Sequence, residues 1–110
     1  DQCGSRGLGD VYKRQPQMSI NTIEMLRTSL ETFLIKDPKE VKSRFNIIQK
    51  QDDIIDELNS DVRTRLIELM KNKPHEIERA TYLLWVAHNL ERIADRGVNI
   101  AERSMLLVGN

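Results

Sequence analysis

Apolar residues recur at helical spacing along two long segments of this 110-residue chain, and each segment begins at a proline. Because an α-helix turns once in about 3.6 residues, steps of three, four or seven keep side chains on one face. Both segments are therefore predicted to be helices with a buried stripe. In residues 38–70 the stripe is Val41, Phe45, Ile48, Ile55, Val62, Leu66 and Leu69. In residues 74–108 it is Ile77, Ala80, Leu84, Ala87, Ala94, Val98, Ala101 and Met105.

A third segment rich in helix formers, residues 19–36, precedes these two, and the three are separated only by short links that end in Pro38 and Pro74. Proline suits the first turn of a helix, so each proline is expected to mark a helix start. Short links make consecutive helices antiparallel neighbours. The predicted fold is all-α, an antiparallel three-helix bundle with long second and third helices.

Residues 1–15 show no helical periodicity, contain three of the five glycines, and are separated from the remainder by Pro16. They resemble translated adapter or vector sequence, although a disordered native arm is the alternative. They also lack the continuous apolar region of a secretory signal, so export is not expected. The sequence therefore predicts one domain, residues 16–110, behind a leader that does not belong to it.

Composition excludes several functional classes. Seventeen basic residues balance seventeen acidic ones, so the chain lacks the excess positive charge that nucleic acids or anionic membranes attract. No stretch approaches the roughly 20 apolar residues of a transmembrane segment, and the single cysteine, Cys3, cannot pair within the chain. We therefore expect a soluble cytoplasmic protein. Because the sequence contains neither a Gly-rich phosphate loop nor a set of residues typical of nucleophilic catalysis, we also expect that it is not an enzyme.

Acidic residues interrupt both apolar stripes. Asp52 and Asn59 fall on the first stripe, and Asp56 lies one turn from Asp52 on the same edge. In the second stripe Glu91 fills the vacant position. A strip of polar residues runs along the neighbouring edge of that helix, with members His88, Glu91, Asp95, Asn99 and Glu102.

The two acidic motifs are expected to lie at the same height in the bundle. Counted from the link near Asn72, both pairs lie roughly 24 to 33 Å away at a rise of about 1.5 Å per residue. Antiparallel packing would then place four carboxylates side by side, those of Asp52, Asp56, Glu91 and Asp95. Like charges in a half-buried seam need compensation. Protons, Arg92 and Arg96, or a bound cation could supply it, and the residues alone favour none of these.

Residues 83–103, LLWVAHNLERIADRGVNIAER, resemble the signature of the PhoU family of phosphate-transport regulators. Family members are described as two repeated three-helix bundles with E(D)xxxD motifs. Asp52 to Asp56 and Glu91 to Asp95 fit that motif, and one repeat is present, similar to the C-terminal one. The chain departs from the commoner family form at Ala94, often glycine, and at Arg96, often histidine, where a cation beside the ligands could weaken metal binding.

The resemblance implies a cytoplasmic negative regulator of the phosphate regulon that acts in signal transduction without catalysis. Its implied partners are components of the phosphate ABC transporter and a PhoR-type sensor histidine kinase, and a homo-oligomer is possible. It also implies a metal ion or cluster of iron, zinc, manganese or magnesium on Asp52, Asp56, Glu91 and Asp95, with Asn99 and Glu102 as further candidate ligands. The alternative is a metal-free helical module that docks partner proteins.

Overall fold

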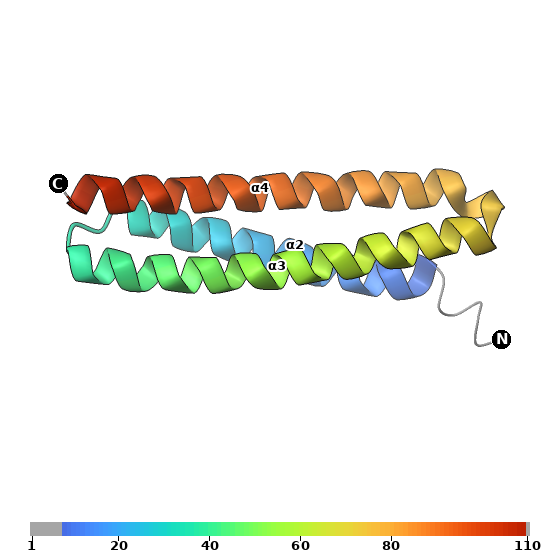
Figure 1. Cartoon of the computed structure of the whole chain (residues 1–110), viewed down its shortest axis with the longest axis horizontal. Coiled ribbons are helices and arrows are strands. Elements are labelled where there is room, and N and C mark those ends of the chain that lie inside the picture. Colours follow the sequence, from blue (N-terminus) through green and yellow to red (C-terminus); the bar gives the residue numbers. More distant parts are fainter. Residues whose placement is uncertain (1–7, 110) are drawn as a thin grey trace.

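The chain forms three long helices that lie side by side. The structure, a computed structural model, describes the backbone of residues 8–109 and the side chains of residues 16–109. The helices are α2 (Leu8–Phe33), α3 (Pro38–Asn72) and α4 (Ile77–Gly109), with one 3-10 turn, η1 (Pro74–Glu76), between α3 and α4. Figure 1 shows α3 running antiparallel to both α2 and α4 in a rod of 57 × 21 × 15 Å. The predicted all-α three-helix bundle is confirmed.

Both ends of α3 follow from local chemistry. Asp37 caps the N-terminus, because its side chain accepts a hydrogen bond from the Lys39 N–H, and Pro38 occupies the first turn. At the other end the Lys73 N–H donates to the Leu69 carbonyl. Lys73 then leaves the helical conformation, with φ −135° and ψ 78°, because a residue before a proline disfavours the helical region. The prediction of helix starts at Pro38 and Pro74 holds, although Pro74 opens the short η1 turn that leads into α4.

The predicted start of the first helix at residue 19 was wrong, and its predicted end at residue 36 lies three residues after the observed end. Helix α2 passes through Pro16 and begins at Leu8, so the loss of one N–H donor does not end it. It ends at Phe33, where the N–H groups of Leu34 and Ile35 donate to carbonyls three residues earlier and so close the last turn. Asp37 is extended because Pro38 follows. The remainder of the predicted leader, including Cys3, lies outside the described residues, and its origin stays a prediction.

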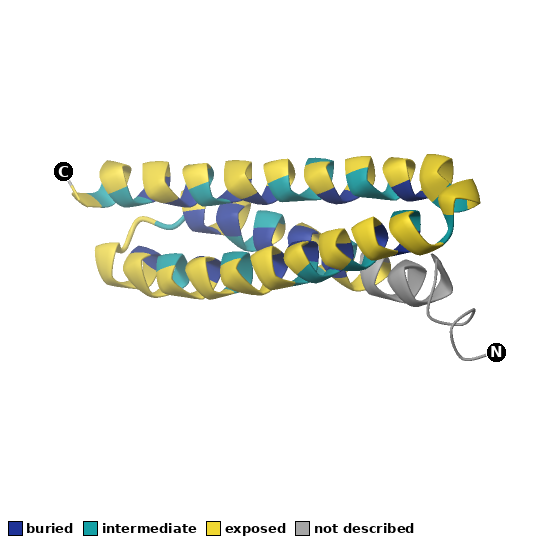
Figure 2. Ribbon diagram, turned by 45° about the vertical axis from the view of Figure 1, so that its right-hand side comes forward, coloured by how far each residue is buried: buried dark blue, intermediate teal, exposed yellow. Residues whose placement is uncertain are grey.

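The core is built from the predicted stripes. On α3 every predicted stripe residue except the half-buried Phe45 is buried, and Asn59 is buried with them. On α4 the buried residues are small, namely Ala80, Ala87, Ala94, Gly97, Ala101 and Ser104. Ile77, predicted to be in the stripe, is 46% exposed because it stands at the first residue of α4, next to the link. Figure 2 shows the buried strip running along the inner side of each helix.

Helices α2 and α4 approach each other closely at Gly97. A Cβ atom added there would lie 3.0 Å from the Met25 Sδ and 3.3 Å from the Ser29 Oγ, which is tighter than ordinary van der Waals contact. The small residues of α4 therefore let the larger side chains of α2 and α3 fill the centre of the bundle. None of the helices in the described part of the chain combines the length and the apolar composition of a membrane span.

Candidate metal centre

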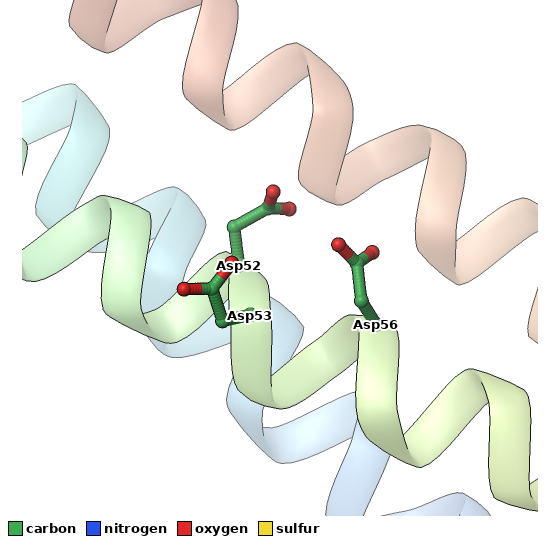
Figure 3. Close-up of side chains that lie close together, drawn as sticks. All are labelled: Asp52, Asp53 and Asp56. Atoms are coloured by element: carbon green, nitrogen blue, oxygen red, sulfur yellow. The ribbon is translucent and has the colours of Figure 1, made fainter.

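Three carboxylates lie together in the middle of α3. Asp52, Asp53 and Asp56 each offer an oxygen, and these oxygens lie within 4.8 Å of one another. Figure 3 shows the side chains of Asp52 and Asp56 directed toward the neighbouring helix, while Asp53 points away from it. Asp53 was not among the predicted site residues, because one step along a helix turns a side chain by about 100° out of the stripe. Its position directly after Asp52 was the available signal.

The acidic residues of α4 act on the same group. Glu91 and Asp95 both raise the pKa of Asp52 and the pKa of Asp56 through their negative charge. Among residues 16–109, the group whose carboxylate oxygens all lie within 4.8 Å of one another contains Asp52, Asp53 and Asp56, and Glu91 and Asp95 are not part of it. The two residues of α4 therefore influence the group through their charge. Whether the group binds a metal stays a prediction.

Burial is the first cause of both shifts in pKa. Desolvation, followed by repulsion from Asp56, Asp95, Asp53 and Glu91, raises the pKa of Asp52 from 3.8 to about 6. The pKa of Asp56 is also raised, by desolvation, by the charges of Glu91, Asp95 and Asp53, and by a side-chain hydrogen bond with Glu91. Two α3 carboxyls therefore favour the protonated form more than ordinary aspartates do, and a cation bound to them would have the opposite effect.

Glu91 is held in place by α3. The Asn59 Nδ2 donates a hydrogen bond of 3.0 Å to the Glu91 Oε2, and the Arg63 guanidinium lies 4.0 Å from the Glu91 Oε1. This hydrogen bond accounts for the burial of Asn59, because a buried amide needs a hydrogen-bond partner. The contacts link the two helices at the acidic group and fix the position of one carboxylate.

A cation that the sequence analysis did not consider, Arg63, lies beside Glu91. Arg92 and Arg96 were two of the candidate counter-charges, but both are exposed, and within residues 16–109 neither forms an ion pair, since each follows its acidic neighbour and so points toward solvent. Arg63 lies seven residues after Asp56 and therefore shares its face of α3. That heptad spacing was the signal that could have identified it.

One carboxylate oxygen in the group has no protein partner. Among the described residues, the Asp52 Oδ1 is buried and accepts no hydrogen bond, and the same holds for the neighbouring Gln51 Oε1. A buried acceptor without a partner is costly, and a cation would satisfy it. Oxygen-only donor sets suit Mg²⁺, Ca²⁺, Mn²⁺ and iron better than they suit soft metals. The residues present thus fit a hard divalent or trivalent cation.

Asn99 and Glu102, the two further candidate ligands, lie elsewhere on α4. They line an open cavity of about 760 Å³ together with Phe45, Arg103, Met105 and Leu106. Phe45 is seven residues before Asp52, so this cavity lies about 10 Å along the bundle from the acidic group. Among the described residues, Glu102 is not part of the carboxylate group that Asp52, Asp53 and Asp56 form, and a ligand role of Asn99 stays a prediction.

Comparisons with known proteins all lead to one family. The sequence model of the PhoU domain family matches residues 16–104. A phosphate-specific transport system accessory protein PhoU homolog 2 of Thermotoga maritima is 36% identical over 93 residues, which is 84% of this chain and 38% of that protein. A phosphate-specific transport system accessory protein PhoU homolog of Deinococcus radiodurans is 33% identical over 96 residues, which is 87% of this chain and 40% of that protein.

The match covers only part of each relative. A third relative, the PhoU homolog of Rhizobium meliloti, is 32% identical over 77 residues, 70% of this chain and 31% of that protein. The chain thus spans about two fifths or less of the length of these curated relatives. No solved structure matches it.

Proposed function

This chain belongs to the PhoU domain family, and from that premise we propose that it regulates phosphate uptake. The support is that the relatives are named accessory proteins of the phosphate-specific transport system. The proposed role is repression of the phosphate regulon when phosphate is plentiful. The chain would do so in the cytoplasm by coupling the phosphate ABC transporter to a sensor histidine kinase of the PhoR type, without catalysing a reaction.

The second part of the proposal is a metal centre at the contact between α3 and α4. What supports it is the group formed by Asp52, Asp53 and Asp56, whose oxygens lie within 4.8 Å of one another. Burial and the charges of the neighbouring carboxylates, Glu91 and Asp95 on α4 among them, raise the pKa of Asp52. The proposed ligands are Asp52, Asp56, Glu91 and Asp95, joined by Asp53. A bound cation would supply positive charge that offsets their mutual repulsion.

The protein's own residues would prepare this centre. Asn59 and Arg63 contact the Glu91 carboxylate and fix its orientation before a cation binds, so binding would cost less conformational entropy. The buried Asp52 Oδ1 would gain the partner that it lacks among the described residues. A site that joins α3 to α4 would also stiffen the face that a transporter or kinase could recognise, because a shared cation stabilises only the folded arrangement.

We expect near-stoichiometric metal in the purified 110-residue chain. The chain would be purified without chelator, and iron, zinc, manganese and magnesium would be determined by elemental mass spectrometry. Replacing Asp52, Asp56, Glu91 and Asp95 together by Ala should abolish binding, because too few oxygen donors would remain.

A matched control removes four carboxylates away from this face. Its sites are Glu24, Glu68, Glu76 and Glu78, and their replacement by Ala should leave the metal content unchanged. If the parent carries no metal after incubation with each ion, or if the control loses as much metal as the test variant, the metal centre is rejected.

The competing function is a metal-free helical module that docks partner proteins, and one observation favours it. The Glu91 carboxylate already has partners without any ion, since Asn59 donates a hydrogen bond to it and the positively charged Arg63 lies 4.0 Å away. A chain without metal whose four-Ala variant is more stable than the parent would support this module, since the carboxylates would then only repel one another.

We expect the chain to bind the phosphate ABC transporter and the cytoplasmic part of a PhoR-type sensor kinase. The immobilised chain would be exposed to each protein from Thermotoga maritima in biolayer interferometry, with an ABC transporter for sugars as the specificity control. Dissociation constants at least about tenfold lower for the phosphate transporter than for the control would support the coupling role. Equal or undetectable binding to all three would contradict it.

A further inference from the structure

The solvent-facing side of α4 carries a narrow row of large and basic side chains. Trp85, Arg92, Arg96 and Arg103 follow one another in steps of seven, four and seven residues. These steps confine the four side chains to an arc of about 40° on the helix, in a row about 27 Å long. All four residues are exposed, and Figure 2 shows the outer side of α4 open to solvent along its length. We call these four residues the outer α4 seam.

The arginines of the outer α4 seam have no acidic partner. Within residues 16–109 none of the three guanidinium groups forms an ion pair, whereas Arg44, Arg63 and Arg65 each pair with a carboxylate. Asp95 is the one acidic residue three or four positions away from any of them, and its charge acts on the acidic group of α3. Three positive charges therefore stay without a partner along one face of a chain whose net charge is zero.

Apolar surface lies at both ends of this row. At one end Tyr82, one turn before Trp85, is 67% exposed, and Trp85 itself is 65% exposed. At the other end Arg103 borders an open cavity of about 410 Å³ together with Phe33, Leu106 and Leu107. Tryptophan, tyrosine and arginine are the side chains that most often carry the binding energy of a protein interface. The seam thus combines apolar anchors at its ends with positive charge between them.

The shape and the charge of the seam indicate an acidic helix as its occupant. A straight row along one helix matches the contact line of a second helix packed beside it, where charged pairs determine the partner. Carboxylates at the same four- and seven-residue spacing would meet each arginine, and the planar guanidinium group suits a carboxylate. A nucleic acid or an anionic membrane would instead attract a chain with excess positive charge, but seventeen basic residues here balance seventeen acidic ones.

We propose that the outer α4 seam binds an acidic amphipathic helix of a partner protein. The carboxylates of that helix pair with Arg92, Arg96 and Arg103. Its apolar residues cover Trp85 at one end of the seam and the cavity beside Arg103 at the other. Binding requires neither a metal ion nor the transporter and kinase proposed above, so either proposal can be rejected without the other.

Trp85 is the only tryptophan in the sequence, so the fluorescence of the 110-residue chain reports directly on the seam. The probe is a synthetic amphipathic helix of about 20 residues that carries Glu on one face at the spacing of the three seam arginines. We expect its addition at up to about 300 μM to shift the Trp85 emission to shorter wavelength as the indole leaves water. The same peptide with Gln in place of each Glu should bind at least about tenfold more weakly.

Charge reversal identifies the contacts. Combining Arg92→Glu, Arg96→Glu and Arg103→Glu should weaken binding of the Glu peptide at least about 100-fold, and a peptide with Lys at the same positions should bind this variant instead. The matched control reverses the charge of three exposed lysines of α3 to Glu, namely Lys39, Lys42 and Lys50. It should bind the Glu peptide as the parent does. Circular dichroism would show that both variants remain helical.

Several results would overturn the proposal. The first is a parent that binds the Gln peptide as well as the Glu peptide, or neither of them. The second is a control that loses as much affinity as the seam variant, or a seam variant that does not bind the Lys peptide. The third is a Trp85 shift with phosphatidylglycerol vesicles, with poly(U) or on concentrating the chain alone, but none with the Glu peptide. That result would assign the seam to a lipid surface, to RNA or to a second copy of the chain.

Discussion

Replacing Ile55 by Ala is expected to lower the free energy of unfolding by about 3 kcal/mol. Ile55 is fully buried in the core cluster, where the three helices meet. Its replacement removes three heavy atoms from a close-packed environment and leaves a cavity that rigid helices cannot close. Urea unfolding followed by circular dichroism would measure the change, with a midpoint that falls while the m-value stays constant.

The preceding residue provides a matched control for this prediction. Ile54 is the same residue type on the same helix and is 49% exposed, so Ile54→Ala should cost less than about 1 kcal/mol. Equal losses at the two positions would mean that α3 is rotated about its axis relative to the arrangement described above. A larger loss at Ile54 than at Ile55 would contradict the assignment of the core.

Replacing Asp52 by Asn is expected to stabilise the metal-free protein at neutral pH. The folded-state pKa of Asp52 is about 6, above its ordinary value of 3.8, so the folded protein binds the proton more tightly than the unfolded chain does. The resulting stability is fully present below pH 3.8 and is lost as the pH rises through 6. Asn resembles the protonated carboxyl, and its advantage over Asp52 should therefore grow across this window.

The expected gain above pH 7 is about 1 kcal/mol, since solvent screening at a half-buried group reduces the effect well below the full linkage value. Thermal unfolding of parent and variant would be compared from pH 4 to pH 8 in the presence of chelator. Glu68→Gln, at an exposed site on the same helix, serves as the matched control for the loss of one negative charge. A constant difference between Asp52→Asn and the parent would contradict the prediction.

Part of the candidate site could be predicted from the sequence. Asp52, Asp56, Glu91 and Asp95 were predicted as a site because polar residues at heptad positions interrupt an apolar repeat, and the structure places Asp52 and Asp56 together with Asp53. Their equal distance from the link between the helices then followed from the helix rise. Asp53 and Arg63 were not predicted. Their spacing from Asp52 and Asp56 was visible in the sequence, but spacing alone does not show which exposed residues lie near a neighbouring helix.

The first helix shows the limit of the same reasoning. Its pattern contains two seams on opposite faces, an aliphatic one around Ile23 and a polar one around Thr22. Hydrophobicity alone favours burial of the aliphatic seam, yet the structure buries the polar one. Its hydroxyls find acceptors within α2, and its small side chains fit against the small residues of α4.

The sequence by itself determined the local features of this protein: three helices, the starts set by Pro38 and Pro74, the stripes of α3 and α4, and two acidic motifs at one height. These depend on interactions between residues a few positions apart, for which the helix period is sufficient. Only the tertiary structure decided the rotation of α2 and the ion pair of Arg63 with Glu91, which neither Arg92 nor Arg96 forms within residues 16–109. Those outcomes depend on how three helices share one core, where close packing and the pairing of buried polar groups outweigh the preference of any single helix.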